Sequence, residues 1–341
     1  GLNSPHAGNI IDPLGGRKDL AGKILRTPLD PETTFRDDPL RMMRAVRLGA
    51  QLEFAIDEKA LEAIRTMADH ISVVSQERIT DELLKTLSSP RPSVGLILLF
   101  ETGLMARVFP EVSSMAGTDQ RRDYHHKDVF RHTCTVVDNI AKSTENVWLR
   151  FAALVHDIAK PRTKEYKEGI GWTFHGHEEM GARMMKSVFR KLRLPMEHLS
   201  YVEKLVRLHL RPMVLVDDVV TDSAVRRLIF DAGDAIDDLM VLCRADITSK
   251  NPQLVARYLK NYDIVMEKIR EVEEKDRLRN WQPPVRGDEI MQLCGLKPGK
   301  PVGLLKKAIE EAILEGIIPN DHDAAIAYLL QVKDEVLANA K

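Results

Sequence analysis

Histidine and aspartate residues that could bind a metal ion recur through the middle of the sequence. In chain order the candidates are His132, the adjacent pair His156-Asp157, His177, His209 and Asp246. Imidazole and carboxylate ligands together suit divalent ions such as Mn, Fe, Mg, Co, Ni or Zn. Such an ion activates water and offsets charge on phosphate oxygens, so the chemistry to expect is hydrolysis. A single histidine on a helix is more often a polar core residue than a metal ligand. The prediction of a metal site therefore depends on the whole set of candidates.

Helical segments must position these side chains. Apolar spacing predicts helices over residues 129–141, 147–159, 178–192, 196–208, 223–230 and 235–249. His156 and Asp157 close the second of these helices, just before Pro161. Neighbours on a helix are about 100° apart, but both can reach an ion seated across the helix end. Residues 163–174 alternate and contain two glycines, which predicts a small β-excursion.

The ordered set, with Ala159-Lys160-Pro161 behind the pair, resembles the HD-domain metal-dependent phosphohydrolases over about residues 128–250. The resemblance implies that His156 and Asp157 are catalytic and that Lys160 helps with phosphate. It implies a metal held by His132, His156, Asp157 and Asp246, with a second metal or a phosphate at His177 and His209. His125, His126 and His175 have no clear counterpart in that family. We expect them at the surface or in contact with the ligands without binding the metal.

A second candidate site lies near the amino terminus. A helical pattern begins at Asp37, and in it Asp38 precedes Arg41 by one turn, while Arg41, Arg44 and Arg47 share a face. Carboxylate acceptors and guanidinium donors can read the hydrogen-bonding edge of a base. The simpler interpretation is an ion pair along a helix.

The surrounding motifs favour the base-reading interpretation. Residues 11–20, 23–27 and 35–47 resemble consecutive motifs of bacterial class II tRNA nucleotidyltransferases and poly(A) polymerases, and Glu77-Arg78-Ile79 resembles the start of the helical neck that follows. The resemblance implies that Asp38 and Arg41 select the incoming nucleotide, that ATP and CTP are substrates of the parent enzyme, and that tRNA is the partner. Asp37 stands where the family commonly has Glu. The HD segment and residues 287–291 are more similar to CCA-adding enzymes than to poly(A) polymerases.

One motif of that family is absent. The two catalytic metals of nucleotidyl transfer are held by carboxylates of a Gly-Ser-x-x-Asp-x-Asp motif, which does not occur in this sequence. We therefore expect that the chain begins inside a domain and that these residues do not add nucleotides.

Composition is that of a mainly α globular protein. The 341 residues are 44% hydrophobic and 30% charged, with a formal net charge of -1 and three scattered cysteines. The cysteine usage favours a reducing cytoplasm, and no apolar run approaches the roughly 18 residues of a membrane span. Membrane is therefore not an expected partner, and the oligomeric state stays open.

We predict four segments: residues 1–36 as the end of the nucleotidyltransferase head, 37–117 as a helical neck with nucleotide-selecting and RNA-binding parts, 118–251 as the HD domain, and 252–341 as a helical body or tail. The head remnant should contain strands over residues 9–11 and 23–27. The neck should contain helices over 58–67, 76–87 and 94–102, with Ser75 capping the second, and a linker over 109–122. The tail should contain a long charged helix from Pro252 to about Arg279 and helices over 287–294, 302–314 and 324–337.

Three functions fit these observations. The first is the carboxy-terminal part of an enzyme that maintains the 3′-CCA end of tRNA, with an HD domain of the 2′,3′-cyclic phosphodiesterase or phosphatase type. The second is a poly(A) polymerase relative or a helical RNA-binding platform whose metal site is vestigial. The third is a stand-alone HD hydrolase of small nucleotides.

Overall fold

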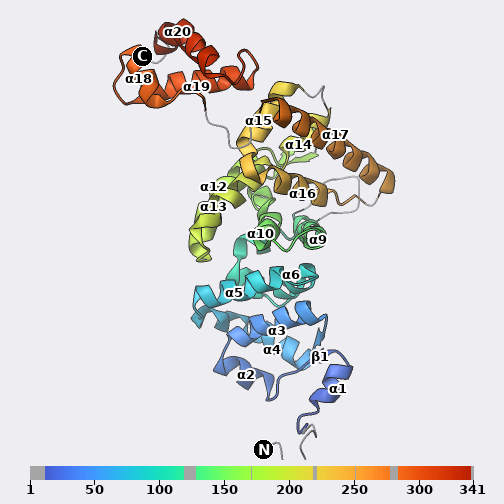
Figure 1. The fold of residues 1–341 in the computed structure, drawn as a ribbon. Coiled ribbons are helices and arrows are strands. Elements are labelled where there is room, and N and C mark those ends of the chain that lie inside the picture. Colours follow the sequence, from blue (N-terminus) through green and yellow to red (C-terminus); the bar gives the residue numbers. More distant parts are fainter. Residues whose placement is uncertain are drawn as a thin grey trace, which may run out of the picture. The chain divides into compact units, whose positions relative to one another are not determined.

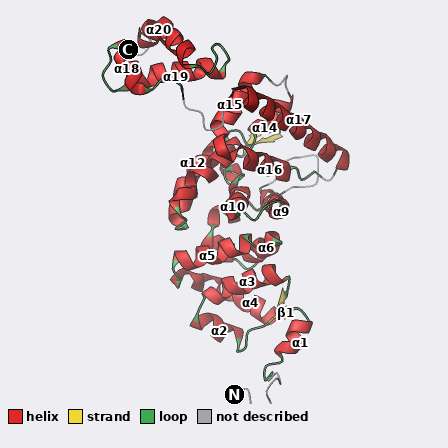
Figure 2. Cartoon of the chain, in the orientation of Figure 1, coloured by secondary structure: helices red, strands yellow, loops and turns green. Residues whose placement is uncertain are grey.

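Helices make up most of the computed structural model, which describes residues 12–118, 128–169, 171–217, 221–249, 251–276 and 283–338. The described residues form only four short strands, so the predicted mainly α class is confirmed (Figure 2). None of their helices is both long and apolar enough to cross a membrane. The chain divides into two compact units, residues 1–207 and 208–341. The four-segment division remains a prediction.

The first unit begins with short elements around one parallel strand pair (Figure 1). The elements are α1 (Gly16–Ala21), β1 (Ile24–Leu25), α2 (Pro31–Asp37), α3 (Leu40–Leu52) and β2 (Ala55–Ile56). The partner of β1 is β2, with Ile24 opposite Ala55, and β2 was not predicted. The predicted strand over residues 9–11 lies outside the described residues.

The first predicted helix of the neck, expected from Asp37, is preceded by a separate helix that was not predicted. Asp30 accepts a hydrogen bond from the Thr33 backbone N–H at 2.9 Å, so α2 begins at Pro31 and ends at Asp37. Asp38 is extended, and α3 starts at Leu40. The prediction that Asp38 and Arg41 share one helix is therefore wrong, because Asp38 lies in the joint between α2 and α3.

The neck continues with α4 (Glu58–Met67), η1 (Ala68–Val73), α5 (Gln76–Leu87), α6 (Pro92–Glu101), α7 (Leu104–Val108) and α8 (Pro110–Ser113). The predicted bounds of α4 and α5 are confirmed, although the Ser75 side chain makes no capping hydrogen bond. The predicted linker is wrong at its start, since Phe109, Val112 and Met115 are buried around α8. Apolar side chains at these positions outweigh the Pro, Ser and Gly that suggested a loop. Residues 119–127, including His125 and His126, are outside the described part.

The first unit ends with the helices that surround the predicted metal ligands. They are α9 (Val129–Ala141), α10 (Val147–Val155), α11 (Lys160–Thr163), α12 (His177–Lys191), η2 (Met196–His198) and α13 (Leu199–Leu208), with β3 (Glu165–Lys167) and β4 (Gly171–Thr173) before α12. The predicted β-excursion is confirmed as an antiparallel pair in which Tyr166 faces Trp172. Side-chain caps explain two helix starts: Asp128 accepts from Arg131 N at 3.0 Å, and Asn146 accepts from Trp148 N at 3.0 Å.

The second unit is helical throughout its described residues. It contains α14 (Arg211–Asp217), α15 (Asp222–Ala232), η3 (Gly233–Ala235), α16 (Ile236–Asp246), α17 (Pro252–Asp276), α18 (Gly287–Cys294), α19 (Lys300–Leu314) and α20 (His322–Ala338). Helix α14 was not predicted, while the long helix after Asn251 is confirmed as far as Asp276. The last three helices enclose an apolar cluster that includes Val285, Ile290, Leu305 and Leu329.

Candidate metal centre

Helix α10 carries the candidate site at its carboxyl end. Every residue from Leu149 to Val155 is buried, so this helix is a core element on all sides. The helix ends at Val155, four residues earlier than predicted, and His156 and Asp157 lie in the turn that follows. Their exposed fractions are 0% and 1%. A histidine and a carboxylate buried this deeply require partners, since burial of an unpaired charge is costly.

Three imidazoles surround the Asp157 carboxylate. Its Oδ2 atom lies 3.2 Å from His156 Nε2 and 3.7 Å from His132 Nε2, and its Oδ1 atom lies 3.3 Å from His177 Nε2. The ligand atoms of His132 and His156 lie within 4.8 Å of each other, and so do those of Asp157 and His177. Helices α9 and α12 and the turn after α10 thus bring together four of the predicted ligands.

The ring tautomers of two histidines follow from their backbone contacts. His156 Nδ1 lies 2.8 Å from the Ala153 carbonyl oxygen, and His177 Nδ1 lies 2.7 Å from that of Phe174. A carbonyl oxygen only accepts, so each Nδ1 donates and each neutral ring has its lone pair on Nε2. Both Nε2 atoms point at a carboxylate, which also accepts. These acceptors repel one another unless a proton on each ring or a metal cation lies between them. The donor set therefore fits a divalent cation.

Charge around Asp157 keeps it ionised. Burial by itself would raise the pKa of this carboxyl, but the charges of His156 in its protonated form and of Lys160, with the hydrogen bonds that the protonated rings of His156 and His177 donate through Nε2, hold the pKa well below its ordinary value. Lys160 Nζ lies 2.7 Å from Asp157 Oδ2. An anionic oxygen ligand is what a divalent cation requires at neutral pH.

The two other predicted ligands belong to the second unit. His209 follows α13 and is 3% exposed, and Asp246 is the last residue of α16. Within that unit the Cys243 thiol, three residues before Asp246, donates to the His209 backbone oxygen at 3.0 Å. His175 is exposed, as expected.

The nucleotide-selecting candidates, Asp38 and Arg41, lie in the first unit. Their contacts in the structure are with other groups and not with each other. Asp38 Oδ2 lies 3.3 Å from Arg78 Nη2 of α5, and Asp38 Oδ1 accepts from the Leu40 backbone N–H at 3.2 Å. Arg41 Nη1 donates to the Thr34 backbone oxygen at 3.2 Å. Both side chains are thus held at the joint between α2 and α3.

Sequence reasoning missed the structural roles of two arginines in this unit. Arg150, 4% exposed, donates five hydrogen bonds to the backbone oxygens of Leu87, Ser89, Ala141 and Thr144. Arg47 donates to Glu82 at 2.6 Å and to Gln51 at 2.6 Å, so it is part of the α3–α5 contact rather than of an open basic face. An arginine inside the otherwise apolar run of residues 147–155 was the one available signal for Arg150.

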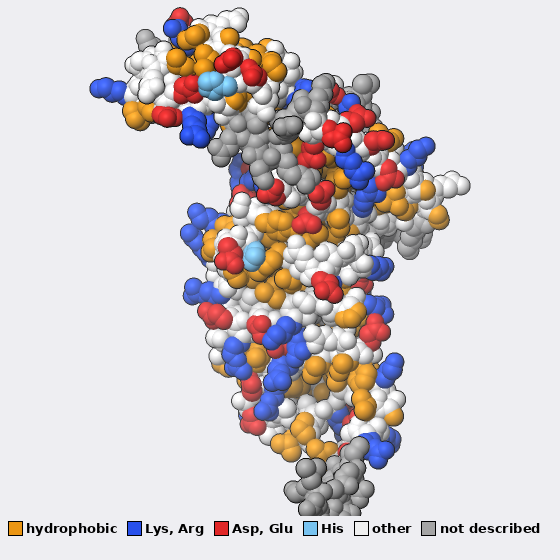
Figure 3. Space-filling view, viewed as in Figure 1, with side chains coloured by type: hydrophobic (Ala, Val, Ile, Leu, Met, Phe, Trp, Pro, Cys, Tyr) orange, Lys and Arg blue, Asp and Glu red, His pale blue; other side chains and the backbone are white. Residues whose placement is uncertain are grey.

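The charge on one face of the molecule does not single out a partner. On the face shown in Figure 3, basic and acidic side chains are interspersed over the helices of the first unit. This mixture agrees with the formal net charge of -1. Recognition of a nucleic acid would then depend on local groups rather than on the field of the whole chain.

Two family models match the sequence. The one described as the probable RNA and SrmB-binding site of polymerase A matches residues 53–115. The HD domain model matches residues 129–251, the segment that contains the candidate ligands.

Curated relatives match over most of the chain. An A-adding tRNA nucleotidyltransferase from Deinococcus radiodurans is 30% identical over 92% of this chain and 73% of its own length. A CC-adding tRNA nucleotidyltransferase from Thermus thermophilus is 32% identical over 95% of this chain and 73% of its own length. The chain therefore spans about three quarters of each of these relatives.

The fold is also similar to that of solved structures. The CCA-adding enzyme of Bacillus stearothermophilus, solved in complex with CTP, aligns with a TM-score of 0.62 and 24% identity, over 97% of this chain and 71% of that enzyme. At this identity the comparison supports the fold alone.

Proposed function

We propose, from the premise that this chain belongs to the tRNA nucleotidyltransferase family, that it serves the maintenance of tRNA 3′ ends and that its HD domain is a metal-dependent phosphohydrolase. The premise rests on the two relatives that are at least 30% identical over most of the chain. The observation that carries the hydrolase is the pair of imidazole Nε2 atoms within 3.3 Å of the buried Asp157 carboxylate. Substrates would be phosphate esters at RNA or nucleotide ends, of the 2′,3′-cyclic type.

His132, His156, Asp157 and Asp246 would hold the metal, and His177 and His209 would contact a second metal or the phosphate. When bound, a divalent cation supplies hydroxide from water near neutral pH and offsets charge on the phosphate oxygens. The backbone oxygens of Ala153 and Phe174 orient the rings of His156 and His177 for this task.

Lys160 would bind the substrate phosphate. Its side chain is 15% exposed and its ammonium lies beside Asp157, so the side chain reaches both the ligand cluster and solvent. A cation at this place offsets part of the charge of an incoming phosphate ester and fixes its orientation. His156 and Asp157 would be the catalytic residues of the hydrolysis.

Asp38 and Arg41 would read the base of the nucleotide to be added to tRNA. The carboxylate offers acceptors and the guanidinium offers donors, which match the edges of adenine and cytosine. Their anchoring to α5 and α2 keeps the two groups in fixed positions. ATP, CTP and tRNA are the implied ligands of this part.

A polypeptide of these 341 residues should not add nucleotides, because it lacks the Gly-Ser-x-x-Asp-x-Asp carboxylates. The test is incubation with tRNA that lacks its 3′ end, together with CTP, ATP and magnesium. Extension of the tRNA would refute this part of the proposal and leave the hydrolase part untouched.

The hydrolase is tested by metal content and by turnover of a 2′,3′-cyclic nucleotide. His156→Ala and Asp157→Ala should each lose bound metal, measured by elemental analysis, and should lose hydrolysis while retaining their helical circular dichroism. Glu197→Gln, a change to an exposed carboxylate in the same domain, should retain both. Unchanged metal content in both ligand variants would show that Asp157 and His156 do not form the site.

A further inference from the structure

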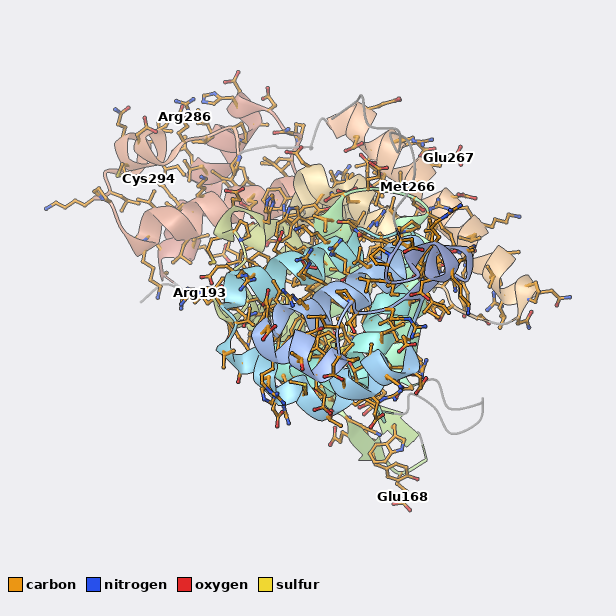
Figure 4. All side chains as sticks on the ribbon, turned by 90° about the horizontal axis from the view of Figure 1, so that it is seen from below. Glu168, Arg193, Met266, Glu267, Arg286 and Cys294 are labelled. Atoms are coloured by element: carbon orange, nitrogen blue, oxygen red, sulfur yellow. The ribbon has the colours of Figure 1, made fainter. Side chains whose placement is uncertain are left out.

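The hairpin of β3 and β4 begins and ends at the candidate metal centre. Lys160, which bonds Asp157, starts the α11 turn that leads into β3. Phe174, directly after β4, accepts a hydrogen bond from His177 Nδ1 on its backbone oxygen, and its ring lies 5.8 Å from Lys160 Nζ. Both ends of the hairpin are thus anchored to residues of the site. In Figure 4 the hairpin projects from the helices of the first unit, with Glu168 at its tip.

Two large aromatic side chains lie on this hairpin in contact with water. Tyr166 and Trp172 face each other across the strands, with ring centroids 5.3 Å apart and an interplanar angle of 72°. Their exposed fractions are 45% and 41%. A cross-strand aromatic pair contributes roughly 0.2–1 kcal/mol to hairpin stability, which explains why the rings touch. The contact between the two rings does not explain why so much of their aromatic surface remains exposed to solvent.

Basic groups accompany the aromatic pair. From Lys160 to Phe174 the sequence contains four lysine or arginine and two acidic side chains. Lys164 Nζ lies 4.5 Å from the centre of the Trp172 ring. Lys167 is 3.8 Å from Glu165, so part of its charge is already offset. Exposed aromatic rings next to ammonium groups are what single-stranded nucleic acid binds, because bases stack on the rings and the backbone phosphates meet the cations.

We propose that the β3–β4 hairpin is a binding site for an unpaired nucleotide of single-stranded RNA, and that it presents the RNA end to the centre at Asp157. One of the last two bases stacks against Trp172 and Tyr166, and Lys164 binds the adjoining phosphodiester. Trp172 is two residues before Phe174, roughly 7 Å along the strand, so a strand bound there continues towards Lys160. The hydrolytic part of this inference rests on the proposed function, whereas the binding part does not.

The inference narrows the substrate class. A hydrolase of free mononucleotides needs an enclosed pocket for one base, whereas an exposed stacking platform beside the site suits the end of a longer chain. A protein partner fits less well. Two partly exposed rings are a small part of the about 800 Å² that a stable protein interface buries on each side.

Binding is tested without hydrolysis by photo-crosslinking in the presence of EDTA. The probe is a single-stranded oligoribonucleotide with 4-thiouridine as one of its last two bases. We expect crosslinked peptides that contain Tyr166 or Trp172. Crosslink yield should fall about fivefold or more in Trp172→Ala and in Tyr166→Ala. Tyr258→Ala is the matched control, because Tyr258 is a partly exposed ring of α17 with the guanidinium of Arg257 5.3 Å away.

Substrate recognition is tested by a double-mutant cycle on hydrolysis. The substrate is the same RNA ending in a 2′,3′-cyclic phosphate, intact or with an abasic residue at either of the last two positions. In the wild type, loss of the stacking base should raise KM about five- to tenfold, the lower end of the effect of one stacked base. In Trp172→Ala the abasic substitution should raise KM clearly less than it does in the wild type, because one of the two stacking rings is already gone. Lys164→Ala should lower the salt dependence of KM.

The outcomes separate the two proposals. If the wild type does not hydrolyse the substrate but is crosslinked at the hairpin, the proposed hydrolase activity is wrong and the proposed RNA-binding site stands. Crosslinks confined to other segments, or equal abasic effects in wild type and Trp172→Ala, would overturn the platform. So would a self-association that Trp172→Ala abolishes without any change in RNA crosslinking. Circular dichroism and metal content equal to the wild type establish that each variant is folded.

Discussion

Arg150 Nη1 donates a hydrogen bond to the Leu87 backbone oxygen over 2.8 Å, which ties α10 to the carboxyl end of α5. The same guanidinium donates to Ser89 O at 3.0 Å and, through Nη2, to Ala141 O at 3.3 Å, so it also holds the end of α9. Carbonyl oxygens at helix ends have no partner within their helix and carry the negative end of the helix dipole. One buried cation therefore satisfies the ends of two helices and fixes α10, the helix that leads into His156.

Replacing Arg150 by Met should leave these buried carbonyls without their donor. We expect the opening free energy of α5, α9 and α10 to fall by on the order of 3 kcal/mol, measured by amide hydrogen exchange. Arg131→Met is the control. Arg131 is an exposed arginine of α9 that pairs with Glu101, and its loss should cost less than about 0.5 kcal/mol. Equal effects of the two changes would show that Arg150 is not an organising residue.

Lys160→Met should change metal affinity and turnover in opposite directions. The ammonium lies 2.7 Å from Asp157 Oδ2 and repels a cation at the same carboxylate, so its loss should tighten divalent-metal binding several-fold. Hydrolysis should nevertheless fall by about 10- to 100-fold, because a charge that binds phosphate is missing. Metal titration and turnover at saturating metal measure the two effects. Lys186→Met, at an exposed position of α12, should change neither, and parallel losses of affinity and turnover would contradict the phosphate role.

Substitutions of Asp38 should separate its structural role from its recognition role. Asp38→Ala removes the acceptor for the Leu40 N–H and should cost about 1 kcal/mol at the start of α3. Asp38→Asn keeps an acceptor and should leave that stability nearly unchanged, yet it presents a donor to the base and should alter the relative binding of CTP and ATP. Hydrogen exchange and calorimetric titration report the two quantities. Asp37→Asn, at the exposed neighbour, should alter neither, and nucleotide binding unchanged in Asp38→Asn would remove Asp38 from recognition.

The ion pair of His322 with Glu289 should make the stability of the last three helices depend on pH. A hydrogen bond from His322 Nε2 to the Glu289 carboxylate at 2.8 Å raises the pKa of this histidine, against the opposing effect of its desolvation. A raised pKa means that the contribution is fully present below the unfolded pKa of about 6.5 and is lost as the pH rises through the folded value. Wild type should therefore exceed His322→Gln in protection of α18 and α20 at pH 6 and match it at pH 8.5.

Comparing variant with wild type at each pH cancels the intrinsic pH dependence of amide exchange. The matched control is His70→Gln, at an exposed histidine of η1 in the first unit. It should leave the protection of α18 and α20 unchanged at both pH values. A difference between wild type and His322→Gln that grows towards pH 8.5 would contradict the assigned sign.

The sequence by itself determined the local elements and the chemistry of the candidate ligands. Helices α4, α5, α9 and α18 begin and end where apolar spacing predicts, because their amphipathic faces are encoded within the same few residues. The adjacent His156-Asp157 pair was likewise visible, since residue type and position at a helix end suffice to nominate a ligand.

Only the tertiary structure decided which distant groups meet. It paired β1 with β2, Asp38 with Arg78, and Arg150 with the ends of two helices, and it set the tautomers of His156 and His177 through the oxygens of Ala153 and Phe174. Short-range patterns fix φ and ψ within a helix, but they do not fix which surfaces pack across tens of residues. The position of Arg150 inside a core helix is explained only by the tertiary structure, which brings the carbonyl oxygens that accept its hydrogen bonds to it.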